Sequence, residues 1–183
     1  MLILILGVAL WWLAHLFKRI APERRAALGA KGRGPVALAL LVSVVLMIIG
    51  YRMTDGPYWW GATPALKGIN NLLVLAAFWL FAADGMKTAL ARRLRHPQLT
   101  GFSLWAVAHL LVNGDLPSFV LFGGLLIWAL LEMVVINRAE PNWQPSTKPI
   151  LWRKEGMALV GAVVVMLVVG LIHRWLGYNP FGG

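Results

Sequence analysis

Four ionisable side chains lie within apolar stretches of the sequence: His15, Asp84, His109 and Glu132. A titratable group is costly inside a membrane and by default indicates a function. Asp84 and Glu132 lie near the ends of their stretches, where a carboxylate can reach water or a basic loop residue. Structural ion pairs are therefore the better prediction for both. The two histidines can instead hold a metal, because neutral imidazole is a common metal ligand.

His109 lies deep in the run RHPQLTGFSLWAVAHLLVNGD, which starts at Arg95. It follows Pro97 at a distance of about 18 Å along a helix that rises 1.5 Å per residue. At four-residue spacing it shares a helix face with Trp105 and Asn113. One interpretation is a buried metal ligand. The alternative is a neutral histidine that donates a hydrogen bond to a carbonyl of a neighbouring helix.

His15 is the second histidine within an apolar stretch. Trp11 precedes it by one helical turn, and Lys18 and Arg19 follow it on the same helix face. An imidazole beside cations at a membrane edge suits a haem, with iron on the nitrogen and propionates on the cations. The alternative is that Lys18 and Arg19 are ordinary basic residues at the cytoplasmic end of a span.

The composition indicates an integral membrane protein. Of the 183 residues, 60% are hydrophobic and 13% are charged, and the mean hydropathy is +0.73. Soluble domains are about 45–50% apolar and about 25% charged. No polar stretch is long enough for a second domain, so residues 1–183 are expected to form one transmembrane domain. Because the sequence contains no cysteine, disulfides, iron–sulfur clusters and covalent c-type haem are excluded.

Six apolar stretches predict an all-α bundle of about six transmembrane helices: Leu2–Phe17, Val36–Tyr51, Gly68–Met86, Leu99–Val112, Leu116–Ile136 and Gly156–Leu176. The first and fourth are shorter than the roughly 17–25 residues of a typical span. In the last stretch, Gly156, Gly161 and Gly170 are expected to allow close helix contact. Asn-Gly and Asp favour a tight turn between the fourth and fifth stretches, where Asp115 is predicted to cap the fifth helix.

The net charge of +10 is distributed as a topology signal. Fourteen of the 17 basic residues lie in the loops after the first, third and fifth stretches. The positive-inside rule places these loops in the cytoplasm and both termini on the outer, periplasmic side. The basic character therefore needs no nucleic-acid partner.

One segment of the sequence resembles a known family. The run R-H-P-x-L-x-G-x-x-L-W-A-x-A-H-L-L-x-N-G-D from Arg95, followed by S-F-V-L-F-G-G to Gly124, is similar to the bacterial NnrU membrane proteins. The first-span histidine, the basic residues after it and the six-span layout match as well, so the resemblance covers essentially the whole chain. It implies a multi-pass protein of the bacterial inner membrane that serves denitrification, in support of nitrite and nitric oxide reductases.

The NnrU family is similar in turn to plant zeta-carotene isomerase, a membrane enzyme that contains haem b. That similarity implies haem b as the cofactor and His15 and His109 as its iron ligands, and His96 matches the histidine of the R-H-P triplet. The L-V-N-G-D segment after His109 departs from the isomerase pattern, which puts a carotenoid substrate in doubt. The resemblance thus implies a redox, nitric-oxide-responsive or isomerase-like factor. Its partners would be membrane lipids, a hydrophobic substrate or nitric oxide, and the reductases.

The expected cofactor site contains these residues: His15, Lys18, Arg19, Arg95, His96, Trp105, His109 and Asn113. Its lysine and arginines are expected to hold the propionates by charge-assisted pairs. His109 is predicted to be the stronger ligand, in a dry site. His15 is predicted to be the labile ligand, on whose side nitric oxide or a substrate enters.

Ligation of one iron by both histidines requires them to lie at matching depth. If the first helix ends at Phe17, His15 is only about 4 Å from its cytoplasmic edge, whereas His109 is about 18 Å from Pro97. The two depths approach each other if the first helix continues to Ile20 and the Pro97 end of the fourth projects into the cytoplasm. Proline is tolerated in the first turn of a helix, which allows this arrangement.

Two other functions remain open. Isoprenylcysteine and phospholipid methyltransferases share R-H-P-x-x-x-G near their S-adenosylmethionine site, and Arg95, His96, Pro97 and Gly101 fit this fragment. That resemblance implies a lipid or prenyl methyltransferase, although the C-terminal motif of those enzymes is not evident after Glu132. The other function is a cofactor-free assembly factor for nitrite and nitric oxide reductases, in which the histidines serve helix packing alone.

Overall fold

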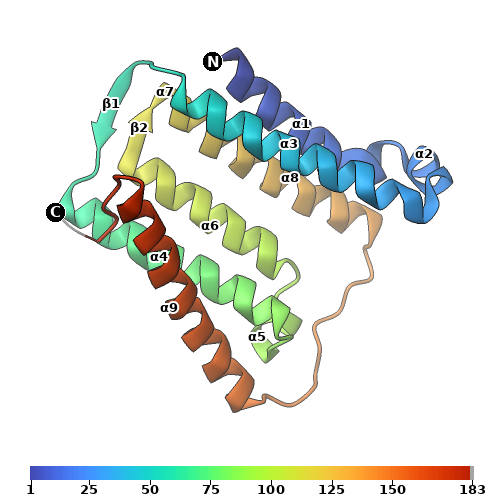
Figure 1. The fold of residues 1–183 in the computed structure, drawn as a ribbon. Helices are drawn as coiled ribbons and strands as arrows, with labels where there is room; N and C mark the ends of the chain where they lie inside the picture. Colours follow the sequence, from blue (N-terminus) through green and yellow to red (C-terminus); the bar gives the residue numbers. More distant parts are fainter. Residues whose placement is uncertain (182–183) are drawn as a thin grey trace.

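The structure is a computed structural model that describes residues 1–181 (Figure 1). The described chain is mostly helical, as the sequence predicts, with one short pair of strands. Its elements are α1 (Leu2–Ile20), α2 (Pro22–Ala27), a 3-10 turn (Gly29–Gly32), α3 (Arg33–Arg52), β1 (Tyr58–Gly61), α4 (Pro64–Gly85), α5 (Ala89–Arg93), α6 (Pro97–Val112), β2 (Asn113–Asp115), α7 (Leu116–Ser118), a π-helical turn (Phe119–Gly123), α8 (Gly124–Ala139) and α9 (Trp152–Trp175).

Five helical stretches of the described chain are long and apolar enough to cross a membrane: Leu2–Ile20, Arg33–Arg52, Pro64–Gly85, Leu116–Ala139 and Trp152–Trp175. They coincide with five of the six predicted spans to within a few residues, and give the chain a multi-pass membrane layout. The sixth, α6, has 16 residues, or about 24 Å of helix against a hydrocarbon core of about 30 Å. The count of six spans therefore stays a prediction.

The long helices pack as a row of neighbours. α3 packs on α1, α1 on α8, α8 on α6, α6 on α4, and α4 on α9. Figure 1 shows this row folded into two diverging arms, one with α1, α3 and α8 and the other with α4, α6 and α9. α6 lies in the middle of the row, where it joins the arms.

Shielding by its neighbours explains why α6 can be short. Among its residues only Gln98 is exposed. A Cβ atom on Gly101 would come within 2.9 Å of the Ala77 backbone oxygen and 3.2 Å of Leu80 Cβ, so α6 and α4 are in close contact. A helix surrounded by protein need not match the thickness of the lipid by itself.

The glycines of α9 differ from Gly101. A Cβ atom on Gly156 or Gly161 would meet nothing within 4 Å, and one on Gly170 would meet the ring of Phe181 in the C-terminal segment. The prediction of close helix contact at these glycines is therefore wrong. Spacing in the sequence does not say which face of a helix meets a neighbour.

Both ends of the described chain lie at the same end of the bundle (Figure 1). The Met1 ammonium donates to Thr54 Oγ1 at 2.7 Å, just after α3. Asn71 Nδ2 of α4 donates to the Pro180 backbone oxygen at 3.1 Å. The antiparallel strands β1 and β2 pair at this end too. Its assignment to the periplasmic side rests on the distribution of basic residues and stays a prediction.

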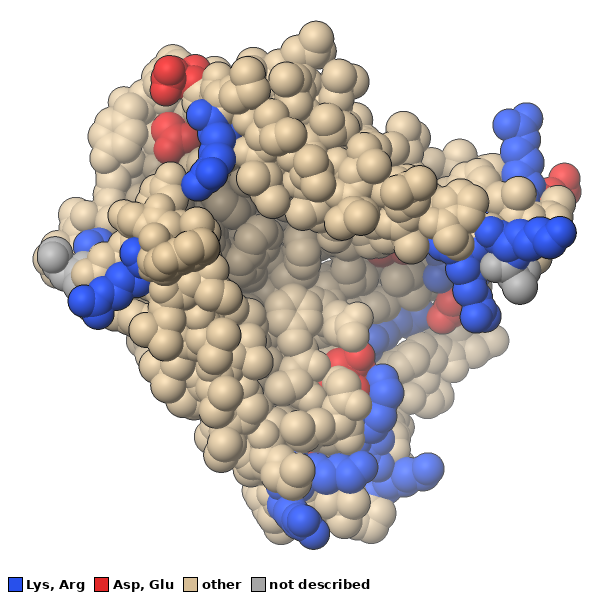
Figure 2. All heavy atoms as spheres, in the orientation of Figure 1, with Lys and Arg blue, Asp and Glu red and all other residues tan. Residues whose placement is uncertain are grey.

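The helix surfaces between the two ends are apolar. In Figure 2 the charged side chains gather around α2, around α5 and the start of α9, and near the C-terminal end. Large hydrophobic side chains such as Leu72, Val160 and Leu171 are more than 60% exposed on the helices. Such a surface is suited to contact with lipid.

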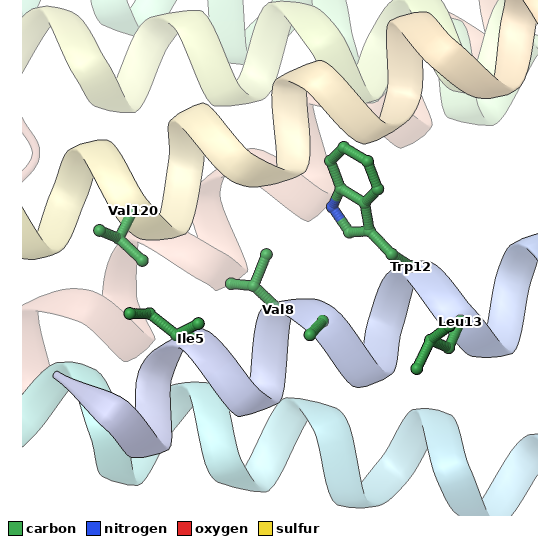
Figure 3. A pocket seen from close by; sticks show the side chains of 6 residues that line it. Ile5, Val8, Trp12, Leu13 and Val120 are labelled. Atoms are coloured by element: carbon green, nitrogen blue, oxygen red, sulfur yellow. The ribbon is translucent and has the colours of Figure 1, made fainter.

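A shallow apolar groove of about 420 Å³ runs along α1 (Figure 3). Its lining residues are Ile5, Val8, Ala9, Trp12, Leu13 and Val120. Trp12 Nε1 donates to the Gly124 backbone oxygen at 3.1 Å and so joins α1 to α8. The rest of the lining is aliphatic, and the Trp12 N–H is already hydrogen-bonded. We therefore assign the groove to contact with lipid chains.

Candidate functional site

A cavity of about 930 Å³ is lined mainly by α3, α4, α6, α9 and the C-terminal segment, with further residues from α1, the π-helical turn and α8. Figure 2 shows the hollow between the two arms of the bundle. Most of the cavity wall is apolar or aromatic, and the polar side chains on it include Tyr51, Arg52, Lys67, Asn70, Asn71, His109, Asn113 and His173. Small-molecule and cofactor sites typically have about 300–1,000 Å³ and this combination of an apolar wall with few polar groups.

His109 lies on the wall of this cavity. Its Nδ1 is 2.9 Å from the Trp105 backbone oxygen, one turn earlier in α6. A carbonyl only accepts hydrogen bonds, so Nδ1 carries the proton and the neutral ring keeps its lone pair on Nε2. The ring packs against Trp105, with centroids 4.8 Å apart, and against Phe122, at 4.6 Å. The hydrogen bond to a carbonyl thus stays within α6, and Nε2 remains available to a ligand.

The N-G-D segment shapes the end of α6 that carries His109. Asn113 Nδ2 donates to the His109 backbone oxygen at 2.9 Å and closes the last turn. Gly114 lies against the ring of Trp60, which leaves no room for a Cβ atom. Asp115 Oδ1 accepts from the backbone N–H three residues on, at 2.8 Å. The predicted helix cap at Asp115 is therefore confirmed.

The S-F-V-L-F-G-G segment builds the wall opposite the His109 ring. It forms the π-helical turn Phe119–Gly123, and such turns are frequent at functional sites. The turn places Phe122 against His109. Just before it, Ser118 Oγ lies 2.8 Å from the Tyr51 hydroxyl of α3. This hydrogen bond fixes the start of the turn to the other side of the cavity.

Replacement of Tyr51 by phenylalanine is expected to lower the free energy of unfolding by about 1 kcal/mol, the typical net contribution of one hydrogen bond. The buried Ser118 hydroxyl, 0% exposed, would lose its partner, while the aromatic ring would remain. Thermal unfolding in detergent, followed by tryptophan fluorescence, measures the change. Tyr58→Phe, at a side chain that is 67% exposed, is the matched control. An equal loss in both variants would contradict the assignment.

His15 lies outside the wall of this cavity. Its Nδ1 is 3.0 Å from the Trp11 backbone oxygen. Its ring packs against Trp11 at 4.2 Å and against Trp128 of α8 at 4.5 Å. α1 does continue to Ile20, as shared ligation requires. His15 nevertheless meets tryptophan rings rather than the cavity.

The two histidines lie at different depths. Trp11 and Trp128, which flank His15, both contact Phe102 of α6, at 6.0 and 5.3 Å. Phe102 precedes His109 by about two helical turns, or roughly 10 Å. Two nitrogen ligands of one metal ion lie only about 4 Å apart, since each metal–nitrogen bond is near 2 Å. The structure does not bring the two rings together, and their joint ligation stays a prediction.

The basic residues expected to hold propionates lie outside the cavity wall as well. Arg19 Nη2 is 3.2 Å from Glu140 Oε1, and Arg95 donates to the Glu140 backbone oxygen. Lys18 is exposed. These arginines join the end of α1 and the start of α6 to the end of α8, and their role toward a cofactor stays a prediction.

The R-H-P-x-x-x-G fragment has structural partners. His96 Nε2 lies 2.8 Å from Asn137 Oδ1 of α8, and Pro97 opens α6. Gly101 makes the close contact with α4 described above. These contacts account for the fragment without an S-adenosylmethionine site.

The two carboxylates within apolar stretches have different surroundings. Asp84 Oδ1 lies 3.2 Å from Lys87 Nζ, which confirms its predicted ion pair. Glu132 forms no ion pair among residues 1–181, and its buried Oε2 has no hydrogen-bond partner. The ion pair predicted for Glu132 is therefore wrong. Arg19 forms its ion pair with Glu140 instead.

Sequence reasoning missed most polar residues of the cavity wall, among them Arg52, Asn70 and His173. Each of these three lies near the end of a long helix, where a polar residue looks interfacial in sequence. Asn70 is only 8% exposed, and its Oδ1 has no hydrogen-bond partner. Trp11 Nε1, from the same wall, is also buried without a partner. Buried polar groups are normally bonded, so a polar group of a bound molecule would give these atoms the partner that they lack.

Comparison with known proteins gives one family. A family model described as NnrU protein matches residues 3–180, nearly the whole chain. No curated protein and no solved structure matches the sequence. Within the described residues, no group of three or more histidine, aspartate and glutamate side chains is arranged to hold a metal ion.

Proposed function

The chain belongs to the NnrU family, and we propose that it binds haem b in the cavity lined by His109. The observation that supports this best is the His109 imidazole, whose Nε2 is left available beside a cavity of about 930 Å³. In the bacterial inner membrane such a protein would serve nitrogen-oxide metabolism, as a redox- or nitric-oxide-responsive factor.

The residues of the cavity fit this group. Imidazole is a common axial ligand of haem iron, and the aromatic wall suits the flat faces of a porphyrin. Arg52 lies on the wall, where a guanidinium can pair with an acid group. When bound, haem b would supply reversible one-electron chemistry and an iron atom that binds small gases.

Neighbouring residues would fix the tautomer and the orientation of the His109 ring. The carbonyl of Trp105 fixes the His109 tautomer, in the way that outer hydrogen bonds orient metal-ligating histidines. Phe122 and Trp105 hold the ring from two sides. Together they keep Nε2 in position and limit the access of water to it.

Haem binding is tested by the visible spectrum of the protein purified in detergent from haem-replete cells, with and without dithionite. We expect a Soret band and a change of spectrum on reduction, and saturable uptake of hemin by any apoprotein. A colourless protein that does not take up hemin would refute the proposal. A reductase subunit that co-purifies with that colourless protein, even after loss of both His15 and His109, would favour a cofactor-free assembly factor.

A further inference from the structure

Two imidazoles lie on the wall of the same cavity, His109 from α6 and His173 from α9. The helices are not consecutive in the row, because α4 packs between them. The cavity therefore has a histidine on each of two separate walls.

The two histidines lie at the same end of the bundle. His109 is three residues before the last residue of α6, Val112, and His173 is two before the last residue of α9, Trp175. These positions are about 4.5 Å and about 3 Å from their helix ends. α6 continues directly into β2, and the segment after α9 bonds back to α4 at this same end. His173 therefore has the matching depth that His15 lacks.

The His109 and His173 rings form the same hydrogen bond through Nδ1. His173 Nδ1 lies 2.8 Å from the Val169 backbone oxygen, one turn earlier, as His109 Nδ1 does from that of Trp105. Each carbonyl accepts the Nδ1 proton, so each neutral ring keeps the lone pair on Nε2. The backbone N–H of Tyr178 also donates to the His173 backbone oxygen at 2.8 Å, which ties the C-terminal segment to this turn.

A cation lies on the same cavity wall. Arg52, the last residue of α3, forms no ion pair within residues 1–181. The arginines near His15 are instead engaged by Glu140. An acidic group on a ligand between the two histidines would find a guanidinium at this end of the bundle.

We infer that His173 would hold the haem iron together with His109, and that Arg52 would pair with an acid group of the haem. This inference rests on the haem-binding function proposed above. It places both iron-binding histidines on α6 and α9, on the wall of one cavity, and leaves His15 to pack between Trp11 and Trp128.

The test compares hemin complexes of the full chain in detergent by absorption and electron paramagnetic resonance spectroscopy. The wild type is expected to be low-spin, with two imidazole ligands. His173→Ala is expected to become high-spin, to bind carbon monoxide when reduced, and to return to low spin with excess imidazole. His173→Asn, which can keep the hydrogen bond to Val169, should behave in the same way and guards against a folding defect of the alanine variant. His15→Ala is the competing variant and should keep the low-spin spectrum.

The outcomes separate this inference from the proposed function. A low-spin His173→Ala together with a high-spin His15→Ala would overturn the inference and support the pair predicted from the sequence. Low-spin spectra for both variants would also overturn it. A wild type that takes up no hemin would refute the proposed function itself. Arg52→Ala should weaken hemin binding several-fold while the spin state is kept, whereas Arg19→Ala should leave the affinity unchanged if the site lies where we infer.

Discussion

Replacement of His109 by alanine is expected to abolish most haem binding, with a loss of hemin affinity of at least about tenfold, which corresponds to about 1.4 kcal/mol or more. His109 is the proposed iron ligand, because the family resemblance implies it and because its side chain lines the cavity. Its ring is also fixed by the Trp105 carbonyl and by Phe122. Titration of apoprotein with hemin, followed at the Soret band, measures the change.

Two further variants make this result specific. Leu110→Ala removes a neighbouring side chain of α6 that does not line the cavity, and it should leave the hemin affinity within about a factor of two of wild type. His109→Asn can keep the hydrogen bond to Trp105 but offers no imidazole, so it should lose haem as the alanine variant does. Normal hemin affinity in both His109 variants would remove this residue from the site.

The sequence predicts the helices well because each depends on local composition. Apolar stretches long enough for a span have few alternatives, and proline and charged residues mark their ends. The structure extends α1 to Ile20 and begins α6 at Pro97, close to the predicted bounds. The capping role of Asp115 follows from the same local chemistry.

The candidate site was predictable only in part, because its depth and its walls come from packing between helices. His109 stands out in sequence as a polar residue deep in an apolar run. His173 does not, because a histidine next to Arg174 near a span end looks interfacial. Only the structure shows that α9 turns this residue toward the cavity that His109 lines.

The motif of the family is likewise explained by contacts that have no sequence signature. Asn113 and Gly114 serve the end of α6, through the His109 carbonyl and the ring of Trp60. Phe122 lies on a π-helical turn that positions it against His109. Several residues of the motif thus pack around His109 or fix the helix end that carries it.

Gly101 is the position where packing and cofactor binding make opposite predictions. In the methyltransferase interpretation this glycine lies near S-adenosylmethionine. In the structure a Cβ atom at Gly101 would lie 2.9 Å from the Ala77 backbone oxygen and 3.2 Å from Leu80 Cβ. The backbone oxygen cannot move without displacing α4, so a larger side chain would separate the two helices.

Gly101→Val is therefore expected to lower the free energy of unfolding by about 1–3 kcal/mol, the usual cost of overpacking a close contact. Gly161→Val is the matched control, since the same substitution at an open position of α9 should change it by no more than about 0.5 kcal/mol. Thermal unfolding in detergent measures both. Calorimetric titration of the wild type with S-adenosylhomocysteine tests the methyltransferase interpretation, and we expect no binding. The packing explanation would fail if Gly101→Val proved as stable as Gly161→Val. If, in addition, the wild type bound S-adenosylhomocysteine and Gly101→Val did not, Gly101 would serve a cofactor site.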